Sequence, residues 1–202
     1  NPLSHDWNKV IMMYCDGGSY SGNNATAVPV MWNGTQRFIH YRGARNLDFA
    51  LKTLAKDHGM GEDVTDVLIS GDSAGGLASY WHADRFKSAF PEAFVATVPD
   101  SGFFIGDSTK PEWPAALQWI ASAMNNTAGL DASCVHDAVQ RGVTPGEACT
   151  LPEDVAPHIG VPLFTMNSKY DPALISISTT VKTPAAINGE QQRKNSHLAL
   201  HS

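Results

Sequence analysis

The 202-residue sequence has no apolar stretch as long as a membrane-crossing helix. Its longest apolar runs have the length of β-strands, whereas a bilayer requires ~20 predominantly apolar residues in a row. Cationic residues are also few, with 14 Lys and Arg against 20 Asp and Glu, a formal net charge of -6 and no basic cluster. Because nucleic-acid binding depends on grouped cationic side chains, we expect neither a membrane span nor a nucleic-acid partner.

Cysteine is scarce as well, with three residues in the whole sequence. They are compatible with one bridge and one odd thiol, and a Cys134–Cys149 pair would close a short loop, leaving Cys15. Asn-x-Thr sequons, which are potential glycosylation sites, begin at Asn24, Asn33 and Asn125. Disulfides and N-glycans both form in the secretory pathway, so these features together predict a secreted protein.

The length and the 43% content of hydrophobic residues are enough for one sizeable core, which predicts a single domain over residues 1–202. The chain begins at Asn1 without an initiator Met or a signal peptide and ends at Ser202 after a polar run. We therefore expect both ends to be cut or processed.

Apolar runs of strand length alternate with segments of helical periodicity. The predicted strands are residues 67–70, Val10–Tyr14, Phe94–Val98 and Val161–Met166. The predicted helices cover residues 43–55, 75–85 and 113–124, whereas residues 134–149 are predicted as a loop-rich excursion. Such alternation is typical of an α/β fold with a mainly parallel sheet.

Residues 71–75 read Gly-Asp-Ser-Ala-Gly, which matches the Gly-x-Ser-x-Gly pattern of a nucleophile elbow. In that turn a serine occupies a strained corner between a strand and a helix, so we expect Gly71 and Gly75 to be required for lack of space. The turn would expose the Ser73 hydroxyl as a nucleophile. The Ala74 N–H, at the start of the helix, would help to stabilise an oxyanion.

A second glycine-rich loop, residues 15–22, directly follows the first predicted strand. Amides near Gly18 and Ser19 could provide the other half of an oxyanion hole. The alternative interpretation is a flexible surface turn.

A serine nucleophile needs a base that is oriented by a carboxylate. Asp171 follows the last predicted strand and is our first candidate for the acid, while Asp100 is its rival and Asp72 is expected to be a solvated turn carboxylate. These candidates and the two glycine-bearing turns all follow apolar runs, at the sheet edge where α/β folds bind ligands. The last histidines of the chain are His197 and His201.

Residues 70–79, with His82 and Asp84 behind them, resemble the nucleophile segment of the pectin acetylesterase and Notum family. Further blocks that look like this family, in the same order, are residues 42–45, 100–104 and 162–171. Cys134 and Cys149 match a cysteine pair that the family has before its last strand. The resemblance therefore extends over nearly the whole chain.

The resemblance implies an α/β-hydrolase-like fold with helices on both faces of the sheet and a Ser-His-Asp triad that needs no metal or cofactor. By motif match, Ser73 is the nucleophile, Asp171 is the acid, and Gly18, Ser19 and Ala74 supply oxyanion amides. The implied reaction is removal of acetyl groups from a polysaccharide. The alternatives are a lipid deacylase resembling Notum or a catalytically silent member of the fold that serves in binding.

The sequence departs from the family pattern in two places. The family loop usually reads Gly-Gly-Gly-Trp-Cys, but this chain has Tyr20 in place of the Trp and no loop cysteine. In the family the catalytic histidine also lies a few residues beyond a Ser-Cys pair, and this chain ends at Ser202, just before the expected position of that histidine. We therefore expect N- and C-terminal family segments to be missing, with the base either after Ser202 or provided by His197 or His201.

Overall fold

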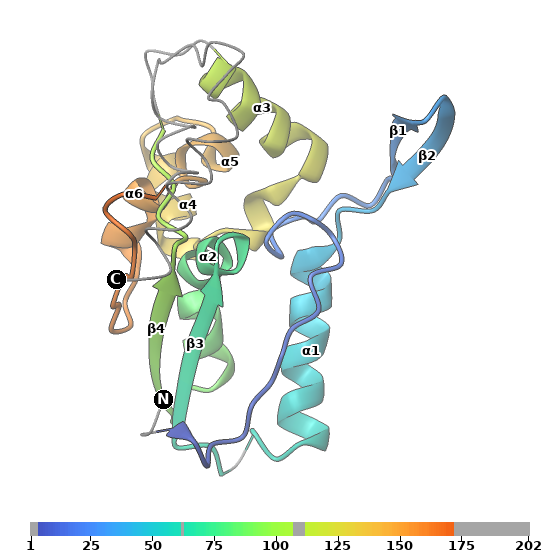
Figure 1. Ribbon diagram of the computed structural model, residues 1–202. Helices are drawn as coiled ribbons and strands as arrows, with labels where there is room; N and C mark the ends of the chain where they lie inside the picture. The colour runs from blue at the N-terminus through green and yellow to red at the C-terminus, as the bar shows by residue number, and fades with distance from the viewer. Residues whose placement is uncertain (1–3, 62, 107–111, 172–202) are drawn as a thin grey trace.

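Two parallel strands form the centre of the fold. This computed structural model describes residues 4–61, 63–106 and 112–171. Strand β3, Asp66–Asp72, pairs with β4, Phe94–Asp100, in a register that runs from Asp66 opposite Phe94 to Asp72 opposite Asp100. Figure 1 shows the two strands side by side. Both were predicted from their apolar runs, and both predictions are confirmed.

A third segment lies beside β4 without forming a regular strand. Leu163 and Met166 make isolated parallel bridges to Thr97 and Asp100. The predicted strand Val161–Met166 is therefore correct in position and direction, but its pairing with β4 is limited to these two bridges.

Helix α2, Ala74–Ala89, packs against β3 and β4 and is buried on almost every side. One side joins a core with the inward-facing residues of β3 and β4, and the other side, with Tyr80 and Trp81, joins a second core of helical residues. A helix that is covered all round needs apolar or small residues on every face. Helix α2 therefore forms the boundary between the sheet and the helical part of the molecule.

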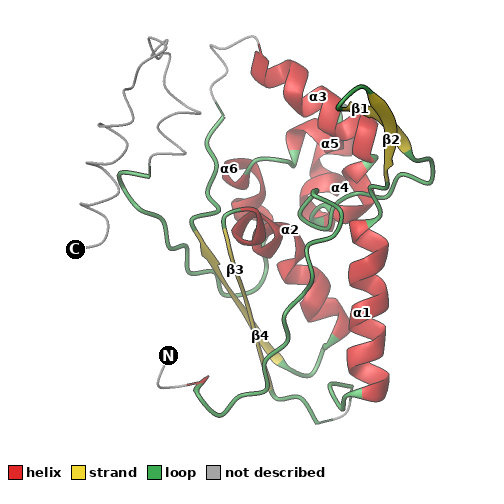
Figure 2. Cartoon of the chain, turned by 45° about the vertical axis from the view of Figure 1, so that its right-hand side comes forward, coloured by secondary structure: helices red, strands yellow, loops and turns green. Residues whose placement is uncertain are grey.

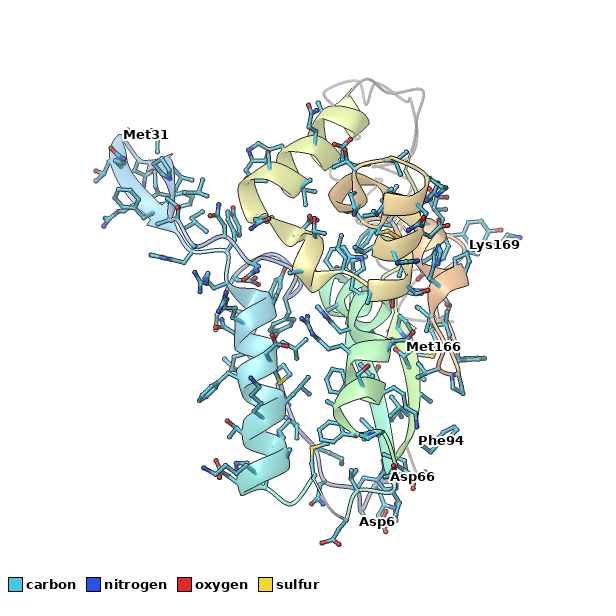
Figure 3. The ribbon with its side chains drawn as sticks, turned by 180° about the vertical axis from the view of Figure 1, so that it is seen from behind. Asp6, Met31, Asp66, Phe94, Met166 and Lys169 are labelled. Atoms are coloured by element: carbon cyan, nitrogen blue, oxygen red, sulfur yellow. A yellow bond between two sulfur atoms is a disulfide. The ribbon has the colours of Figure 1, made fainter. Side chains whose placement is uncertain are left out.

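The two faces of the β3–β4 pair differ in cover. Val67 and Ile69 of β3 are buried in the core that also contains Leu47 and Leu51 of α1, Gly43–Asp57. On the opposite face, Leu68 of β3 is 43% exposed, and Phe94 of β4, which is labelled in Figure 3, is 57% exposed. The α/β fold is confirmed, but within the described residues helices cover one face of this pair rather than both.

The upper part of the molecule is helical (Figure 2). Its helices are α3 (Glu112–Met124), the 3₁₀ turn η2 (Asn126–Gly129), α4 (Ala132–Gln140), α5 (Pro145–Ala148), α6 (Pro152–Val155) and the 3₁₀ turn η3 (Ala156–His158). The prediction of α3 is confirmed. The prediction of a loop-rich excursion at residues 134–149 is wrong, because Asp131 caps α4 by accepting a bond from the Cys134 N–H and Pro145 starts α5.

A disulfide joins Cys134 to Cys149, with the two Cα atoms 5.9 Å apart and both residues fully buried. It links α4 to the residue that follows α5 and closes a loop with a sequence separation of 15. The third cysteine, Cys15, is exposed and has a free thiol.

Replacement of both Cys134 and Cys149 by serine is expected to lower the free energy of unfolding by ~3 kcal/mol, because the unfolded chain then loses the constraint of a loop of this size. Urea denaturation of the double variant measures this loss. The matched control is Cys15→Ser, which should unfold like the wild type. An unchanged midpoint in the double variant would contradict the expected contribution.

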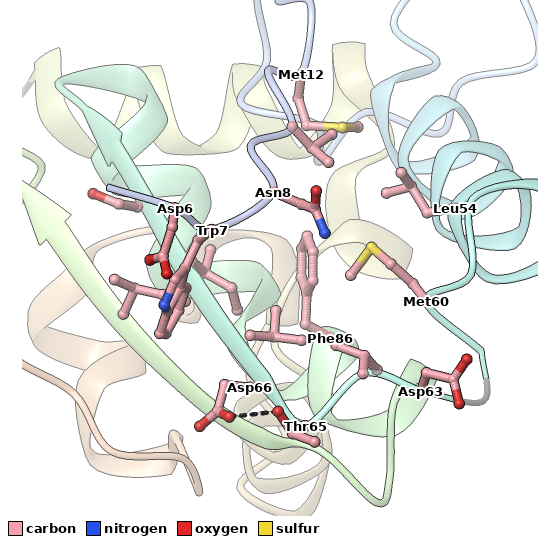
Figure 4. A pocket seen from close by; sticks show the side chains of 16 residues that line it. Asp6, Trp7, Asn8, Met12, Leu54, Met60, Asp63, Thr65, Asp66 and Phe86 are labelled. Carbon is pink, nitrogen blue, oxygen red and sulfur yellow. Dashed lines mark hydrogen bonds between the residues drawn. The ribbon is translucent and has the colours of Figure 1, made fainter. Parts of the chain in front are cut away.

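The predicted strand at Val10–Tyr14 is wrong. The segment runs upward between β3 and α1 (Figure 1) without strand structure, and Ile11 is 87% exposed. A cavity of about 470 Å³ separates part of this segment from β3; Figure 4 shows Trp7, Met12 and Phe86 among its lining residues. An apolar run predicts which side chains favour burial, but a strand also needs a neighbouring backbone within hydrogen-bonding distance.

A β-hairpin that we did not predict projects from the body of the molecule (Figure 1). It consists of β1, Val28–Trp32, and β2, Thr35–Ile39, which pair antiparallel around Asn33 and Gly34. Both turn residues have positive φ angles, 49° and 72°, as a two-residue hairpin turn requires. The Asn-Gly dipeptide is a strong hairpin signal, although we interpreted it only as part of a sequon.

Candidate active site

Ser73 lies at the sharp corner between β3 and α2 and is exposed. Its backbone angles are φ 55° and ψ -114°, a combination that residues with a side chain rarely adopt. The Ser73 N–H donates to the Asp100 carbonyl at 3.0 Å, and the Ser73 carbonyl accepts from the Leu77 N–H at 3.0 Å. The corner is therefore fixed from the end of β4 and from the first turn of α2.

Some positions around this corner must be glycine, because a neighbouring backbone lies too close for a side chain. A Cβ atom at Gly71 would lie 2.6 Å from the carbonyl carbon of Gly75, so Gly71 is required. A Cβ atom at Gly75 would enter open space, which corrects our expectation for that position. The second crowded pair is Gly76 and Gly102, where a Cβ on either residue would collide with the backbone of the other. This contact holds the start of α2 against the exit of β4.

The exits of β4 and of the neighbouring segment are joined by hydrogen bonds. The Ser101 N–H donates to the Met166 carbonyl at 2.7 Å, and the Phe103 N–H donates to Asn167 Oδ1 at 3.1 Å. Asp171 follows four positions after Asn167, and its N–H contacts the Ser168 carbonyl at 3.4 Å. These bonds tie the segment that leads to Asp171 to the strand end that also holds Ser73.

The other carboxylates near the elbow have distinct surroundings. Asp100 Oδ1 accepts a bond from Ser101 Oγ at 2.9 Å, while the Asp100 carbonyl holds the Ser73 N–H. Asp72 is exposed on the turn. His197 and His201, the two histidines considered as the base, lie outside the described residues.

The glycine-rich loop is fastened by the buried carboxylate of Asp16. Its two oxygens accept bonds from the Gly18 N–H at 3.1 Å and from the Gly43 N–H, at the start of α1, at 2.8 Å. Beyond Gly18, Ser19 and Tyr20 both have positive φ angles, 49° and 60°. The Gly18 N–H is thus occupied by Asp16, whereas the Ser19 N–H faces the hydroxyl oxygen of Tyr14 at 3.3 Å.

His82, a residue to which the sequence analysis gave no role, connects this loop to α2. It is 2% exposed, and its Nε2 lies 3.0 Å from the Ser19 carbonyl oxygen. Burial lowers the pKa of His82 from 6.5 to about 3; the bond to Ser19 opposes this effect and the charge of Arg85 adds to it. The signal in the sequence was a polar residue next to Tyr80, Trp81 and Ala83, which are buried in the structure.

The lowered pKa of His82 predicts a pH-dependent stability. Between pH 6.5 and about 3 the unfolded chain binds a proton at this histidine that the folded protein does not. Above pH 6.5, His82 is neutral in both states and does not lower the free energy of unfolding. Below pH 6.5, this free energy falls with the pH, by up to about 1.4 kcal/mol per pH unit.

Urea denaturation at several pH values tests this expectation in the wild type and in His82→Gln, which cannot titrate at this position. The wild type should lose stability more steeply than the variant as the pH falls through this range. Parallel curves for the two proteins would contradict the assignment.

Asp84, two positions after His82, is a second structural contact that the sequence analysis did not identify. Its carboxylate accepts bonds from the Gly160 N–H at 2.9 Å and from the Val161 N–H at 3.2 Å. These bonds fix the start of the segment that runs beside β4 toward Asp171. Helix α2 therefore contacts both the glycine-rich loop and the segment that precedes the candidate acid.

The sequence matches a family of known proteins along nearly its whole length. The family described as Pectinacetylesterase matches residues 1–200. This chain belongs to the pectinacetylesterase family. Within the family it is 31% identical to pectin acetylesterase 7 of Arabidopsis thaliana over 99% of this chain and 48% of that protein. It is also 31% identical to pectin acetylesterase 5 of the same plant, over 85% of this chain and 38% of that protein.

Among solved structures, this chain is similar to the Wnt deacylase Notum from Drosophila. The TM-score is 0.71 with 23% sequence identity, over 88% of this chain and 51% of that one. This similarity supports the α/β-hydrolase-like fold. The chain spans between 38% and 51% of the length of these three relatives.

Two further observations concern the described part of the chain as a whole. The described residues contain no cluster of His, Cys, Asp or Glu with the geometry of a metal site. Within the same residues, no helix combines the length and the apolar character needed to cross a bilayer.

Proposed function

We propose that this chain is a serine carboxylic ester hydrolase with Ser73 as its nucleophile. The observation that carries the proposal is the strained and exposed conformation of Ser73, φ 55° and ψ -114°, at the junction of β3 and α2. Strained residues persist where the surrounding structure enforces them, and they are concentrated at functional sites. A serine held in this way at a strand-to-helix corner has the arrangement of a nucleophile elbow.

The proposed reaction proceeds through an acyl-enzyme. The base removes the proton from Ser73 Oγ as this oxygen attacks the ester carbonyl, and the N–H groups of Ala74 and Ser19 stabilise the oxyanion. The C–O bond to the alcohol then breaks, and the alcohol leaves with the proton. Water, activated by the same base, releases the carboxylic acid and restores Ser73. Because Asp16 occupies the Gly18 N–H, we assign the loop's contribution to Ser19.

Asp171 is the proposed acid that orients the base, and the base is a histidine able to contact both Asp171 and Ser73. A working base must lie ~2.6–3.2 Å from the hydroxyl it deprotonates, or slightly further without substrate. His197 and His201 remain candidates within this chain, and the family pattern favours a histidine beyond Ser202.

The proposed substrate is an acetyl ester on a polysaccharide. The similarity to proteins named pectin acetylesterases supports this choice. The exposure of Ser73 also suits an acetyl group presented on a polymer. A long acyl chain would instead need an apolar pocket beside the nucleophile, and this requirement separates the acetyl-ester proposal from the lipid-deacylase alternative.

The substrate class is tested by incubating the native protein with acetylated pectin and, separately, with an octanoyl ester. We expect acetate release from pectin at a higher kcat/KM than deacylation of the octanoyl ester. The reverse preference would indicate a lipid deacylase resembling Notum. Hydrolysis of neither ester, by a protein that is folded by circular dichroism, would indicate a silent binding member of the fold.

We also propose that the protein is secreted and glycosylated, with Asn33 as the best-placed acceptor. Asn33 is exposed in the hairpin turn. In contrast, Asn24 Nδ2 donates to the Ala123 carbonyl at 2.8 Å, and Asn125 Nδ2 contacts the Asn23 carbonyl at 3.5 Å. Peptide mapping after treatment with an N-glycosidase tests this order of occupancy. A modified Asn24 beside an unmodified Asn33 would overturn it.

A further inference from the structure

His82 lies on α2, the helix that begins directly after Ser73, and its ring reaches the loop that carries the second proposed oxyanion donor. Its ring bonds to the carbonyl of the peptide between Ser19 and Tyr20, the two residues of this loop with positive non-glycine φ angles. Such angles are unfavourable for residues with a side chain and persist only where contacts enforce them. The His82 bond is one of the contacts that enforce them.

The direction of this bond follows from its partners. A carbonyl oxygen can only accept, so His82 Nε2 carries the hydrogen and donates it to Ser19. The burial that keeps the ring neutral leaves a single N–H on it. Within the part of the chain that the structure describes, His82 Nδ1 has no hydrogen-bond partner. The bond to Ser19 is therefore the single hydrogen bond found for this buried ring there.

The Ser19 N–H contacts an oxygen that a substrate could displace, whereas the other contacts of the loop fix its backbone. Asp16 holds the base of the loop through Gly18 and Gly43, and the Tyr20 hydroxyl donates to the Met12 carbonyl at 2.9 Å. The Ser19 N–H contacts the Tyr14 hydroxyl oxygen at 3.3 Å, a long bond to a half-exposed side chain. A substrate oxyanion would replace that oxygen.

We propose that His82 is a positioning residue, which holds Ser19 in the conformation that presents its N–H to the oxyanion formed at Ser73. The bond attaches the peptide after Ser19 to α2, the helix that begins directly after the nucleophile. Helix α2 therefore holds both parts of the oxyanion hole: it contains Ala74, and it positions Ser19 through His82. This proposal rests on the proposed function. A role in packing alone is the alternative, because the ring also lies edge-on to Tyr20, with centroids 6.5 Å apart.

Paired substitutions separate positioning from packing. His82→Gln places an amide N–H near the position of Nε2, whereas the shorter side chain of His82→Asn does not reach Ser19. Ser88→Ala is the matched control, because Ser88 lies on the same helix and its exposed Oγ bonds to the Asp84 carbonyl. All variants are compared with the native protein for kcat and KM on a small acetyl ester. Hydrogen exchange of the peptide spanning residues 16–21 is measured in parallel.

Loss or misplacement of an oxyanion donor lowers kcat by about 10²–10³-fold. We therefore expect His82→Asn to lower kcat by about 100-fold with KM changed less than about threefold, and His82→Gln to stay within about tenfold of the wild type. Exchange of residues 16–21 should be faster in His82→Asn than in His82→Gln and Ser88→Ala. If His82→Asn does not fold, His82→Met, which is buried but lacks the N–H, takes its place.

Two results would overturn the proposal. One is a kcat in His82→Asn within about threefold of the wild type, and the other is an equal loss in the Gln and Asn variants. If the wild type hydrolyses no ester, the proposed function fails, and the exchange data still decide the contact: equal exchange in the Gln and Asn variants would show that His82 does not hold the loop.

Discussion

Replacement of Ser73 by alanine is expected to lower kcat for a small acetyl ester by ~10⁴-fold or more, because the variant lacks the oxygen that attacks the carbonyl. The free energy of unfolding should change little, since the Ser73 side chain is exposed and the bonds that fix the corner come from its backbone. Steady-state kinetics and urea denaturation of the same preparation measure the two effects.

Ser70→Ala provides the control. Ser70 lies three positions earlier on β3, is also exposed, and its Oγ donates to the Val98 carbonyl at 2.8 Å. Its loss should leave kcat within about tenfold of the wild type. If Ser73→Ala retained activity at that level too, Ser73 would not be the nucleophile.

Asp171→Asn is expected to lower kcat by about 10³–10⁴-fold, because an amide cannot stabilise the histidine cation that forms during the reaction. Asp100→Asn should have a much smaller effect. The contribution of Asp100 to the elbow is its backbone carbonyl, which holds the Ser73 N–H and is retained in the variant. Its carboxylate is already engaged with the Ser101 hydroxyl.

The two aspartate variants are compared side by side for kcat and for thermal unfolding. A large loss of kcat in Asp100→Asn with near-normal activity in Asp171→Asn would reverse the assignment of the acid. A large loss of stability in either variant would show that the carboxylate supports the fold instead.

The elbow and its flanking elements were predictable because their causes are local. Gly71 is required by its contact with Gly75, and β3 and α2 follow from an apolar run that meets a helix start. The Cys134–Cys149 disulfide was also expected, from the family resemblance and from the short loop it closes. In each case neighbouring residues contain most of the information.

The features that escaped prediction depend on partners distant in the sequence. Val10–Tyr14 has the composition of a strand, but in the structure a cavity separates part of it from β3. His82 is 63 positions from Ser19, and nothing near it in the sequence identifies that carbonyl as its partner. The hairpin around Asn33 is different, because its Asn-Gly signal was present and was given another interpretation.

The most direct test of Ser73 as the nucleophile is covalent labelling of the native protein with a fluorophosphonate, followed by mass spectrometry of its peptides. An activated serine reacts with such a probe because its base removes the hydroxyl proton, whereas ordinary serines do not. We predict one adduct, on Ser73, and no labelling of the Ser73→Ala variant. An adduct on a different serine, or an unlabelled wild type that still hydrolyses the acetyl ester, would contradict the assignment of Ser73 as the nucleophile.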